Sequence, residues 1–277
     1  MKNLEGVKMG LWQRTRTAII IIGILFAIIQ FAPPWVFFLA LQLTIIGGLL
    51  EFYSLANRRN FYPQKFLGCI FALIIGATFY FDQFPFLLGF TIITLIAFVY
   101  YVIDTNSLEK LALFPGSFSL TIAGLVYVSL TMNFLYLVRR DFGIYWLYFL
   151  FAVISLGDTG AFLIGKAIGR HKMTPIASPN KTWEGAAGGL LWAAAGAWLA
   201  RKVLLSQFPL LEVIVMGVLV QAMAQVADPL ESLFKRAAGV KDSSSLIPGH
   251  GGILDRIDSY TLTAPVFYYL MKLLIMK

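Results

Sequence analysis

The feature that most constrains this chain is a series of apolar segments, each close to the length that crosses a bilayer as a helix. A helix needs roughly 20 apolar residues to span the hydrocarbon core. Of the 277 residues, 59% are hydrophobic and only 13% are charged, which is far from the composition of a soluble domain. The segments of this kind are 15–31, 35–56, 66–81, 86–103, 116–138, 144–168, 184–204, 210–227 and 254–274. We predict an all-α, polytopic integral membrane protein with about nine transmembrane helices.

The basic residues predict how these segments are oriented. If the N-terminus is cytoplasmic, 16 of the 22 Lys and Arg lie on the inner side, as the positive-inside rule requires. We therefore predict a cytoplasmic N-terminus and a C-terminus on the outer side. Basic loops also explain the net charge of +8 without a nucleic-acid partner. The single cysteine, Cys69, is expected to be an apolar filler.

The acidic residues are concentrated in the C-terminal half of the chain. Eight of the 14 Asp and Glu lie between Asp158 and Asp258. Three polar segments interrupt the apolar sequence there: 155–166, 178–185 and 227–258. We expect residues 1–140 to be a transmembrane scaffold and residues 141–277 to be the transmembrane catalytic region.

Asp158 lies inside the apolar segment 144–168. An ionised carboxylate at membrane depth costs several kcal/mol unless it faces water, a metal or a cation. Its neighbours Gly157, Thr159 and Gly160 are small, so another helix can approach closely. One alternative is an aspartate paired with a lysine only for packing, but a buried ion pair stabilises a fold poorly. We expect Asp158 to face a polar cavity.

The third polar segment has helical spacing. Four polar side chains share one helix face: Asp228, Glu231, Ser232 and Lys235. Pro229 suits a first helical turn with Asp228 at or near the N-cap. We therefore predict a short, separate amphipathic helix that begins at Asp228 and ends at Gly239.

Asp255 and Asp258 lie three residues apart at the start of the last apolar segment, and so share a helix face. Two acidic helix starts can therefore converge at the cytoplasmic boundary, where carboxylates repel one another unless a cation lies between them. Oxygen ligands without a cysteine cluster suit Mg²⁺ rather than Zn²⁺. The candidate metal ligands are Asp228, Asp255, Glu231 and Asp258.

Cations and glycines surround these carboxylates. The cations are Lys181, Lys235, Arg236, Lys241 and Arg256. Cations bind phosphate oxygens, and glycines let the backbone come close to a ligand. The sequence P-G-H-G-G at 248–252, with Gly251 and Gly252, therefore predicts a backbone wrap around phosphate. Within it, His250 has either a hydrogen-bonding role or a role in proton transfer. His171 is expected to be solvated or to face lipid headgroups.

The polar segments also resemble a known family. Residues 232–258, S-L-F-K-R-A-A-G-V-K-D-S-S-S-L-I-P-G-H-G-G-I-L-D-R-I-D, resemble the signature of the phosphatidate cytidylyltransferases (CDP-diacylglycerol synthases). D-T-G-A-F-L-I-G-K at 158–166 and S-P-N-K-T-W-E-G at 178–185 are similar to that family's segments in order and spacing. The resemblance is specific over about 155–265. It implies the reaction CTP + phosphatidate → CDP-diacylglycerol + pyrophosphate, for phospholipid synthesis. The implied place is the cytoplasmic (inner) membrane of a bacterium, with the active site facing the cytoplasm.

The resemblance implies metal ligands. Asp228 and Asp255 would hold Mg²⁺, alone or with a monovalent cation such as K⁺, and Glu231, Asp242 and Asp258 would be further ligands or lie just behind them. Ala227 departs from the family, which has glycine at this place, and its methyl group would tighten the backbone beside Asp228.

The resemblance also implies roles for the other polar residues. Four cations would hold triphosphate or phosphatidate oxygens: Lys235, Arg236, Lys241 and Arg256. Ser178, Lys181 and Thr182 would form a loop over the nucleotide or headgroup. Asp158 would orient a cation or a lysine. No protein nucleophile is required, because the phosphatidate phosphate attacks the α-phosphorus of CTP.

Two other function classes are compatible with parts of this pattern. An ion-coupled transporter binds its ion with intramembrane carboxylates, which Asp158 alone would support. Against it, the charges lie on one side of the membrane and the sequence has no visible inverted repeat. The other alternative is a different membrane transferase that uses a nucleotide-activated lipid. The expected partners are CTP, phosphatidate and membrane lipids, without nucleic acid. A homodimer is left open, because family members are often dimers.

Overall fold

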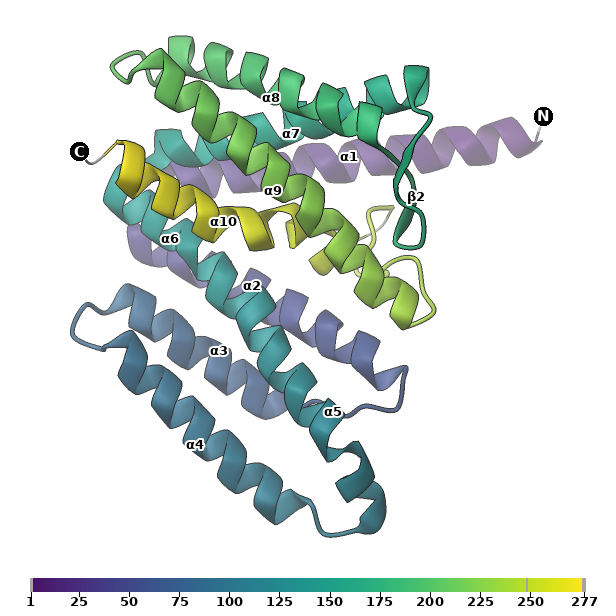
Figure 1. Ribbon diagram of the computed structural model, residues 1–277, viewed down its shortest axis with the longest axis vertical. Helices are drawn as coiled ribbons and strands as arrows, with labels where there is room; N and C mark the ends of the chain where they lie inside the picture. Colours follow the sequence, from purple (N-terminus) through teal and green to yellow (C-terminus); the bar gives the residue numbers. More distant parts are fainter. Residues whose placement is uncertain (1, 248, 276–277) are drawn as a thin grey trace. The chain divides into compact units, whose positions relative to one another are not determined.

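The computed structural model describes residues 2–247 and 249–275 and is almost entirely helical (Figure 1). Its helices are α1 (Lys2–Phe31), α2 (Pro34–Asn57), α3 (Lys65–Tyr80), α4 (Phe86–Asp104), α5 (Leu108–Gly124), the π-helical η1 (Leu125–Leu130), α6 (Thr131–Phe142), α7 (Ile144–Ile168), α8 (Trp183–Leu204), α9 (Leu210–Ala237) and α10 (Leu254–Leu274). Each predicted apolar segment overlaps one of these helices or, for 116–138, the continuous run from α5 to α6. The predicted all-α fold is confirmed.

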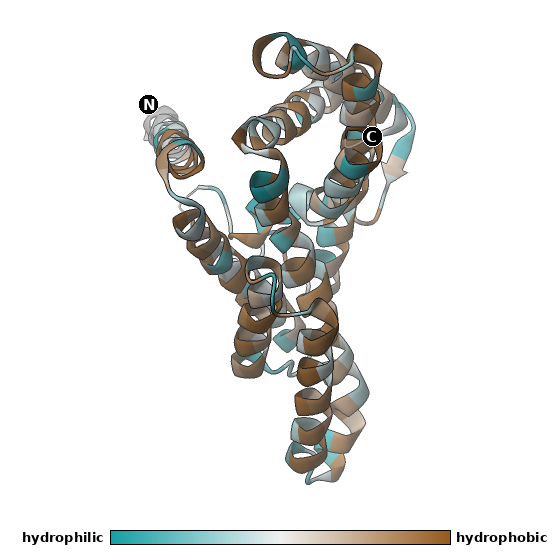
Figure 2. Ribbon diagram, turned by 90° about the vertical axis from the view of Figure 1, so that its left-hand side faces the viewer, coloured by the Kyte–Doolittle hydropathy of each residue, from teal (hydrophilic) through white to brown (hydrophobic). Residues whose placement is uncertain are grey.

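Several helices have the length and apolar character of membrane spans. Among the described residues these are Pro34–Asn57, Phe86–Asp104, Leu108–Phe142, Ile144–Ile168 and Leu210–Ala237. Their exteriors carry exposed apolar side chains, such as Leu43 at 71% and Val102 at 79% exposure. Figure 2 shows this character as hydrophobic, brown ribbon over much of the lower helices. The chain is an integral membrane protein, whereas the number of nine spans and their orientation stay predictions.

The chain divides into two compact units, which we describe separately. The first unit comprises residues 1–130 and 238–257, and the second comprises 131–237 and 258–277, within the described residues. The segment 238–257 thus packs with the N-terminal helices, although it lies near the C-terminus. The division at residue 140 into scaffold and catalytic region concerns function, and it stays a prediction.

The first unit is built around α2, which packs on α3, α5 and η1. Phe52, Tyr53 and Phe71 are almost completely buried in its core. The Tyr53 hydroxyl donates to the carbonyl oxygen of Thr121 at 2.8 Å, so the polar end of this buried ring is satisfied. Cys69 is half-buried and reduced, in keeping with a filler.

In the second unit α7, α8 and α9 pack side by side (Figure 1). Glycine makes the approach of α8 to α7 possible, because a Cβ atom at Gly185 would lie 2.7 Å from the carbonyl oxygen of Ala161. On α10, Phe267 stacks on Phe149 of α7 with 5.8 Å between ring centroids. These contacts hold the helices from which the polar side chains project.

Helix α9 continues through Pro229 without a break. The predicted separate helix is therefore wrong, and Asp228 lies in mid-helix rather than at an N-cap. Proline removes the intrahelical donor for the carbonyl of Gln225. The helix persists because its buried face continues on both sides of Pro229, and packing outweighs one lost hydrogen bond. Gly239 follows the helix with φ 75°, as predicted for its end.

The segment between α7 and α8, which includes the predicted loop 178–185, forms a β-hairpin. Strands β1 (Lys172–Thr174) and β2 (Ser178–Thr182) pair antiparallel. Thr182 then caps α8, since its Oγ1 accepts from the backbone N–H of Gly185 at 3.1 Å. The hairpin is labelled by β2 in Figure 1, and it carries Lys181 to the side of the α7–α9 bundle.

Candidate functional site

The second unit contains a pocket of about 260 Å³ formed by α7, the hairpin, α8 and α9. Four predicted site residues line it: Asp158, Lys181, Thr182 and Asp228. They come from three different elements, α7, β2 and α9, so the fold brings together side chains that are up to 70 residues apart in the sequence. We call this the α7–α9 pocket.

Lys181 and Asp228 form an ion pair across the α7–α9 pocket, with 2.7 Å between Nζ and Oδ2. The two side chains keep 25% and 39% of their surface exposed, so ions and phosphates in solution can reach both. Ser232, one turn along α9, makes a long hydrogen bond of 3.5 Å to the other oxygen of Asp228. The arrangement offers one carboxylate to a cation and one ammonium group to an anion.

Asp158 faces the same pocket from α7. Its Oδ1 accepts from Nε2 of Gln221 at 3.0 Å, a partner that sequence reasoning missed. The charges of Lys181 and Asp228 act on Asp158, and Asp258 of α10 is close enough to Asp158 and Asp228 for charge repulsion. Three carboxylates of the second unit therefore interact with one another, and Lys181 acts on two of them, Asp158 and Asp228.

Glu231 and Lys235 form a buried ion pair one turn further along α9. The Glu231 side chain is completely buried, and that of Lys235 is 11% exposed. In this arrangement the Glu231 carboxylate is held by a lysine, so metal binding by Glu231 would require that pair to rearrange. The roles predicted for both residues stay predictions. Arg236 is exposed at the end of the helix.

The remaining residues of the predicted site lie in the first unit, and Ser178 lies on β2 outside the pocket lining. Lys241, Asp242 and Arg256 are exposed. His250 is half-buried, and its backbone N–H donates to the carbonyl of Ile247 at 2.9 Å, closing a tight turn. Pro248, part of the predicted wrap, lies outside the described residues.

Asp255 is held by the segment 241–253, which we call the signature loop. Its Oδ2 accepts from the backbone N–H of Ser243 at 3.0 Å, from the Ser243 hydroxyl at 2.9 Å and from the backbone N–H of Gly252 at 2.8 Å. Gly251 has φ 80°, and a Cβ atom there would lie 2.6 Å from the same oxygen. The glycines therefore let the loop backbone close around the chain's own carboxylate.

Glu51 of α2 also binds the signature loop, and it was not identified from the sequence. Its Oε1 accepts from the Ser244 hydroxyl at 2.7 Å and from the backbone N–H of Ile253 at 3.0 Å. Its Oε2 accepts from the Ser243 hydroxyl and from the backbone N–H of Leu254, both at 2.8 Å. The sequence does contain a signal for Glu51, because it is the only charged residue in the apolar segment 35–56. A carboxylate inside an apolar segment was the reason for expecting Asp158 to face a polar cavity, and it applies equally to Glu51.

The donor chemistry of these residues fits Mg²⁺. No three His, Cys, Asp or Glu residues within the described ranges come together as an ion site of their own. Mg²⁺, however, is usually bound through one or two carboxylates, with water and substrate phosphates completing the shell. Asp228 belongs to the second unit and Asp255 to the first, and the metal role of both stays a prediction.

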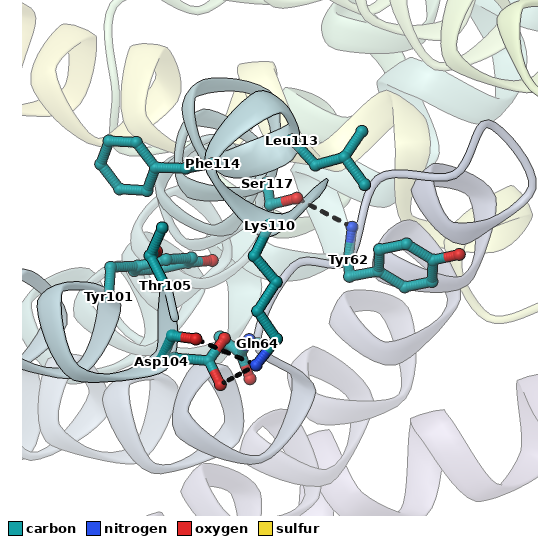
Figure 3. A pocket seen from close by; sticks show the side chains of 9 residues that line it. All are labelled: Tyr62, Gln64, Tyr101, Asp104, Thr105, Lys110, Leu113, Phe114 and Ser117. Carbon is teal, nitrogen blue, oxygen red and sulfur yellow. Dashed lines mark hydrogen bonds and ion pairs between the residues drawn. The ribbon is translucent and has the colours of Figure 1, made fainter. Parts of the chain in front are cut away.

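A second pocket, of about 270 Å³, lies in the first unit (Figure 3). None of the predicted site residues lines it. Its Lys110 bonds to Asp104 twice, at 3.0 Å to the carboxylate and 2.9 Å to the carbonyl. Exposed pairs of this kind are worth about 1 kcal/mol or less. We interpret this contact as a local link between α4 and α5.

His171, predicted to be solvated, has a side chain that is 78% exposed, and it also has a specific partner. Its Nδ1 lies 2.6 Å from Oε1 of Glu184. The backbone N–H groups of Arg170 and His171 also donate to Glu184. This carboxylate thus ties the start of α8 to the hairpin that carries Lys181.

Comparison with known proteins matches most of the chain. The model of the "Cytidylyltransferase family" matches residues 12–274. The chain is 33% identical over 262 residues to the phosphatidate cytidylyltransferase of Staphylococcus saprophyticus, covering 93% of this chain and 98% of that protein. It is 31% identical to the enzyme of that name from Haemophilus influenzae, covering 93% and 97%. A third relative, from Bacillus subtilis, is 31% identical over 186 residues, 66% of either chain.

Proposed function

We propose that this chain, which belongs to the cytidylyltransferase family, is a phosphatidate cytidylyltransferase. The observation that carries the proposal is the similarity to enzymes of that name over 93% of the chain. The α7–α9 pocket supports it, because an accessible Lys181–Asp228 pair suits a phosphorylated substrate. A membrane enzyme is also what the substrates require, since one is a soluble nucleotide and the other a lipid.

The reaction needs no covalent bond to the protein. A phosphate oxygen of phosphatidate attacks the α-phosphorus of CTP, a new P–O–P bond forms, and the bond from the α-phosphorus to the bridging oxygen of pyrophosphate breaks. Negative charge shifts to the departing pyrophosphate. The protein therefore contributes by positioning the two phosphates and neutralising their charge.

We assign the positioning of phosphate oxygens to Lys181 in the α7–α9 pocket, with Lys235, Arg236, Lys241 and Arg256 as further candidates. Asp158 orients Lys181, whose charge acts on it. Ser178 and Thr182 place the hairpin over the nucleotide or headgroup. A His250→Gln variant distinguishes the two roles left open for His250, because glutamine can form hydrogen bonds but cannot transfer a proton.

Mg²⁺ is the cofactor we propose, with or without K⁺. Asp228 and Asp255 would hold it, with Asp258, Glu231 and Asp242 nearby. The bound ion would neutralise phosphate charge during the transfer. Support comes from the oxygen-only donor set and from the repulsion between Asp258, Asp228 and Asp158, which a cation relieves.

We further propose the bacterial cytoplasmic membrane as the location, with the N-terminus and active site facing the cytoplasm. The support is the excess of basic residues on that side, 16 of 22. A homodimer is proposed on the family resemblance alone, and the mass of the purified protein in a lipid nanodisc tests it.

The test is purified protein in detergent, given labelled CTP, Mg²⁺ and phosphatidate. We expect labelled CDP-diacylglycerol and pyrophosphate in equal amounts. Asp228→Asn and Asp255→Asn are each expected to abolish turnover while the protein stays folded. Failure of the folded wild-type protein to form any CDP-lipid would overturn the proposed function, and near-normal rates in either variant would remove that residue from the site.

A further inference from the structure

We infer that Glu51 of α2 is a positioning residue for the signature loop, and through it for Asp255. The inference deepens the proposed function, on which its catalytic consequence depends. Glu51 is separated from its partners by about 190–200 residues of sequence, but it lies in the same compact unit. Its hydrogen-bond partners are loop serines and backbone N–H groups rather than the cations we assign to phosphate binding, so it would act by holding the loop.

All four oxygen lone-pair directions of Glu51 have partners in the signature loop or at the start of α10. Each carboxylate oxygen accepts from one serine hydroxyl and one backbone N–H, at distances of 2.7–3.0 Å. The backbone donors, Ile253 and Leu254, lie at the start of α10, where helix N–H groups have no helical partner and a negative charge is favoured. One side chain therefore fixes both the serines that open the loop and the helix that follows it.

Because Glu51 is buried, its carboxylate carries a large desolvation cost. Stabilising the fold is therefore a poor explanation for a carboxylate at this position. The residue is 8% exposed on a helix of span length and apolar character. A carboxylate in such a place loses most of its hydration, and an apolar residue would pack there at lower cost. A carboxylate does, however, hold four donors in one geometry, which is what an accurately placed loop requires.

The connection from Glu51 to Asp255 runs through Ser243 and Gly252. The Ser243 hydroxyl lies 2.8 Å from Glu51 and 2.9 Å from Asp255, and its single proton serves one carboxylate at a time. The backbone N–H of Ser243 donates to Asp255 independently. A Cβ atom at Gly252 would overlap both Ser243 and Glu51. Any displacement of Glu51 must therefore move the backbone that binds Asp255.

The α2 helix is itself shaped for this contact. Glycines at 47 and 48 face the first turn of α10, and a Cβ atom at Gly48 would lie 2.8 Å from the side chain of Ile257. Gly47 makes the same kind of approach to Ile253. The sequence G-G-L-L-E at 47–51 therefore lets α2 come close enough for the Glu51 carboxylate to reach the loop.

The first test compares kcat and KM for CTP in Glu51→Gln with those in a control variant, Tyr53→Phe. The glutamine keeps the shape but offers its N–H₂ group to the N–H of Leu254, so one bond is replaced by repulsion. Tyr53→Phe removes a buried hydrogen bond two residues away on the same helix, without touching the loop. Changes behind a metal ligand typically cost about 10–100-fold in activity or metal affinity. We expect a loss of that size in kcat for Glu51→Gln, with KM for CTP little changed, and near-normal kcat for Tyr53→Phe.

The second test measures loop order without catalysis. A spin label on Leu246→Cys, in a Cys69→Ser background, reports on the loop because Leu246 is 64% exposed and Cys69 is the only native cysteine. We expect a more mobile label in Glu51→Gln than in the wild type or in Tyr53→Phe. An equally immobile label in folded Glu51→Gln, or a kcat equal to that of Tyr53→Phe, would overturn the inference. If the wild type is inactive but the label on the loop is still more mobile in Glu51→Gln, the proposed function is overturned and the positioning role stands.

Discussion

Gly252→Ala should test the packing of the signature loop most directly. Gly252 is buried, and an added methyl group would overlap the Ser243 hydroxyl and the Glu51 carboxylate. Overpacking of this kind typically costs about 1–3 kcal/mol. Displacement of the carboxylate would also weaken hydrogen bonds to a charged group, each worth about 1.5–3 kcal/mol. We therefore expect a loss of at least about 2 kcal/mol, or roughly 4 °C or more in Tm for packed units of this size.

The assay is thermal unfolding in detergent, followed by intrinsic fluorescence, together with CDP-lipid formation below the transition. Gly23→Ala is the matched control, because a Cβ atom at Gly23 meets nothing within 4 Å. In a helix that change should be neutral or stabilise by about 0.5–1 kcal/mol. A Tm for Gly252→Ala within 1 °C of the Gly23→Ala value, at about wild-type activity, would refute the close approach on which the loop geometry depends.

Three further predictions concern the second unit and the proposed cation. Asp228→Asn should abolish turnover yet change Tm by less than about 2 °C, because an ion pair with an accessible partner such as Lys181 contributes about 1 kcal/mol or less; a large loss of Tm would make Asp228 structural. Lys235→Met removes the lysine beside the buried Glu231 carboxylate and should cost about 3–5 kcal/mol. The double variant with Glu231→Leu should regain most of that loss, and equal melting of the two variants would contradict it. EDTA should stop turnover and added Mg²⁺ restore it; full activity in EDTA would exclude a required divalent ion.

The helical fold follows from sequence periodicity and length, but the ends of its elements do not. Hydrophobic segments predict where helices lie because burial in lipid dominates over local signals. Pro229 is a strong local signal, and it predicted a helix start that does not exist. The continuous buried face of α9 outweighs it, and that face can be recognised only once the neighbouring helices are known. The π-helical η1, between α5 and α6, has no sequence signal for the same reason.

The candidate site was predictable in its residue types but only partly in its contacts. Carboxylates, lysines and glycines in three polar segments pointed to phosphate and metal chemistry, and four of the residues line one pocket. The partners Gln221 and Glu51 lie on helices whose register is set by packing. Reasoning from local spacing cannot relate residue 51 to residue 254, because the connection exists only after some 200 residues have folded between them.

That separation has a consequence for how the protein is made. Glu51 enters the membrane with α2 when its four partners, at residues 243–254, have not yet been synthesised. At about 5–20 residues per second, a stretch of some 200 residues takes roughly 10–40 s. Throughout that interval the acidic side chain of an apolar helix lacks the four donors that satisfy it in the folded protein. The start of α10 thus supplies partners to a helix made much earlier, α2, so Glu51 is fully paired only after the chain has been synthesised through residue 254.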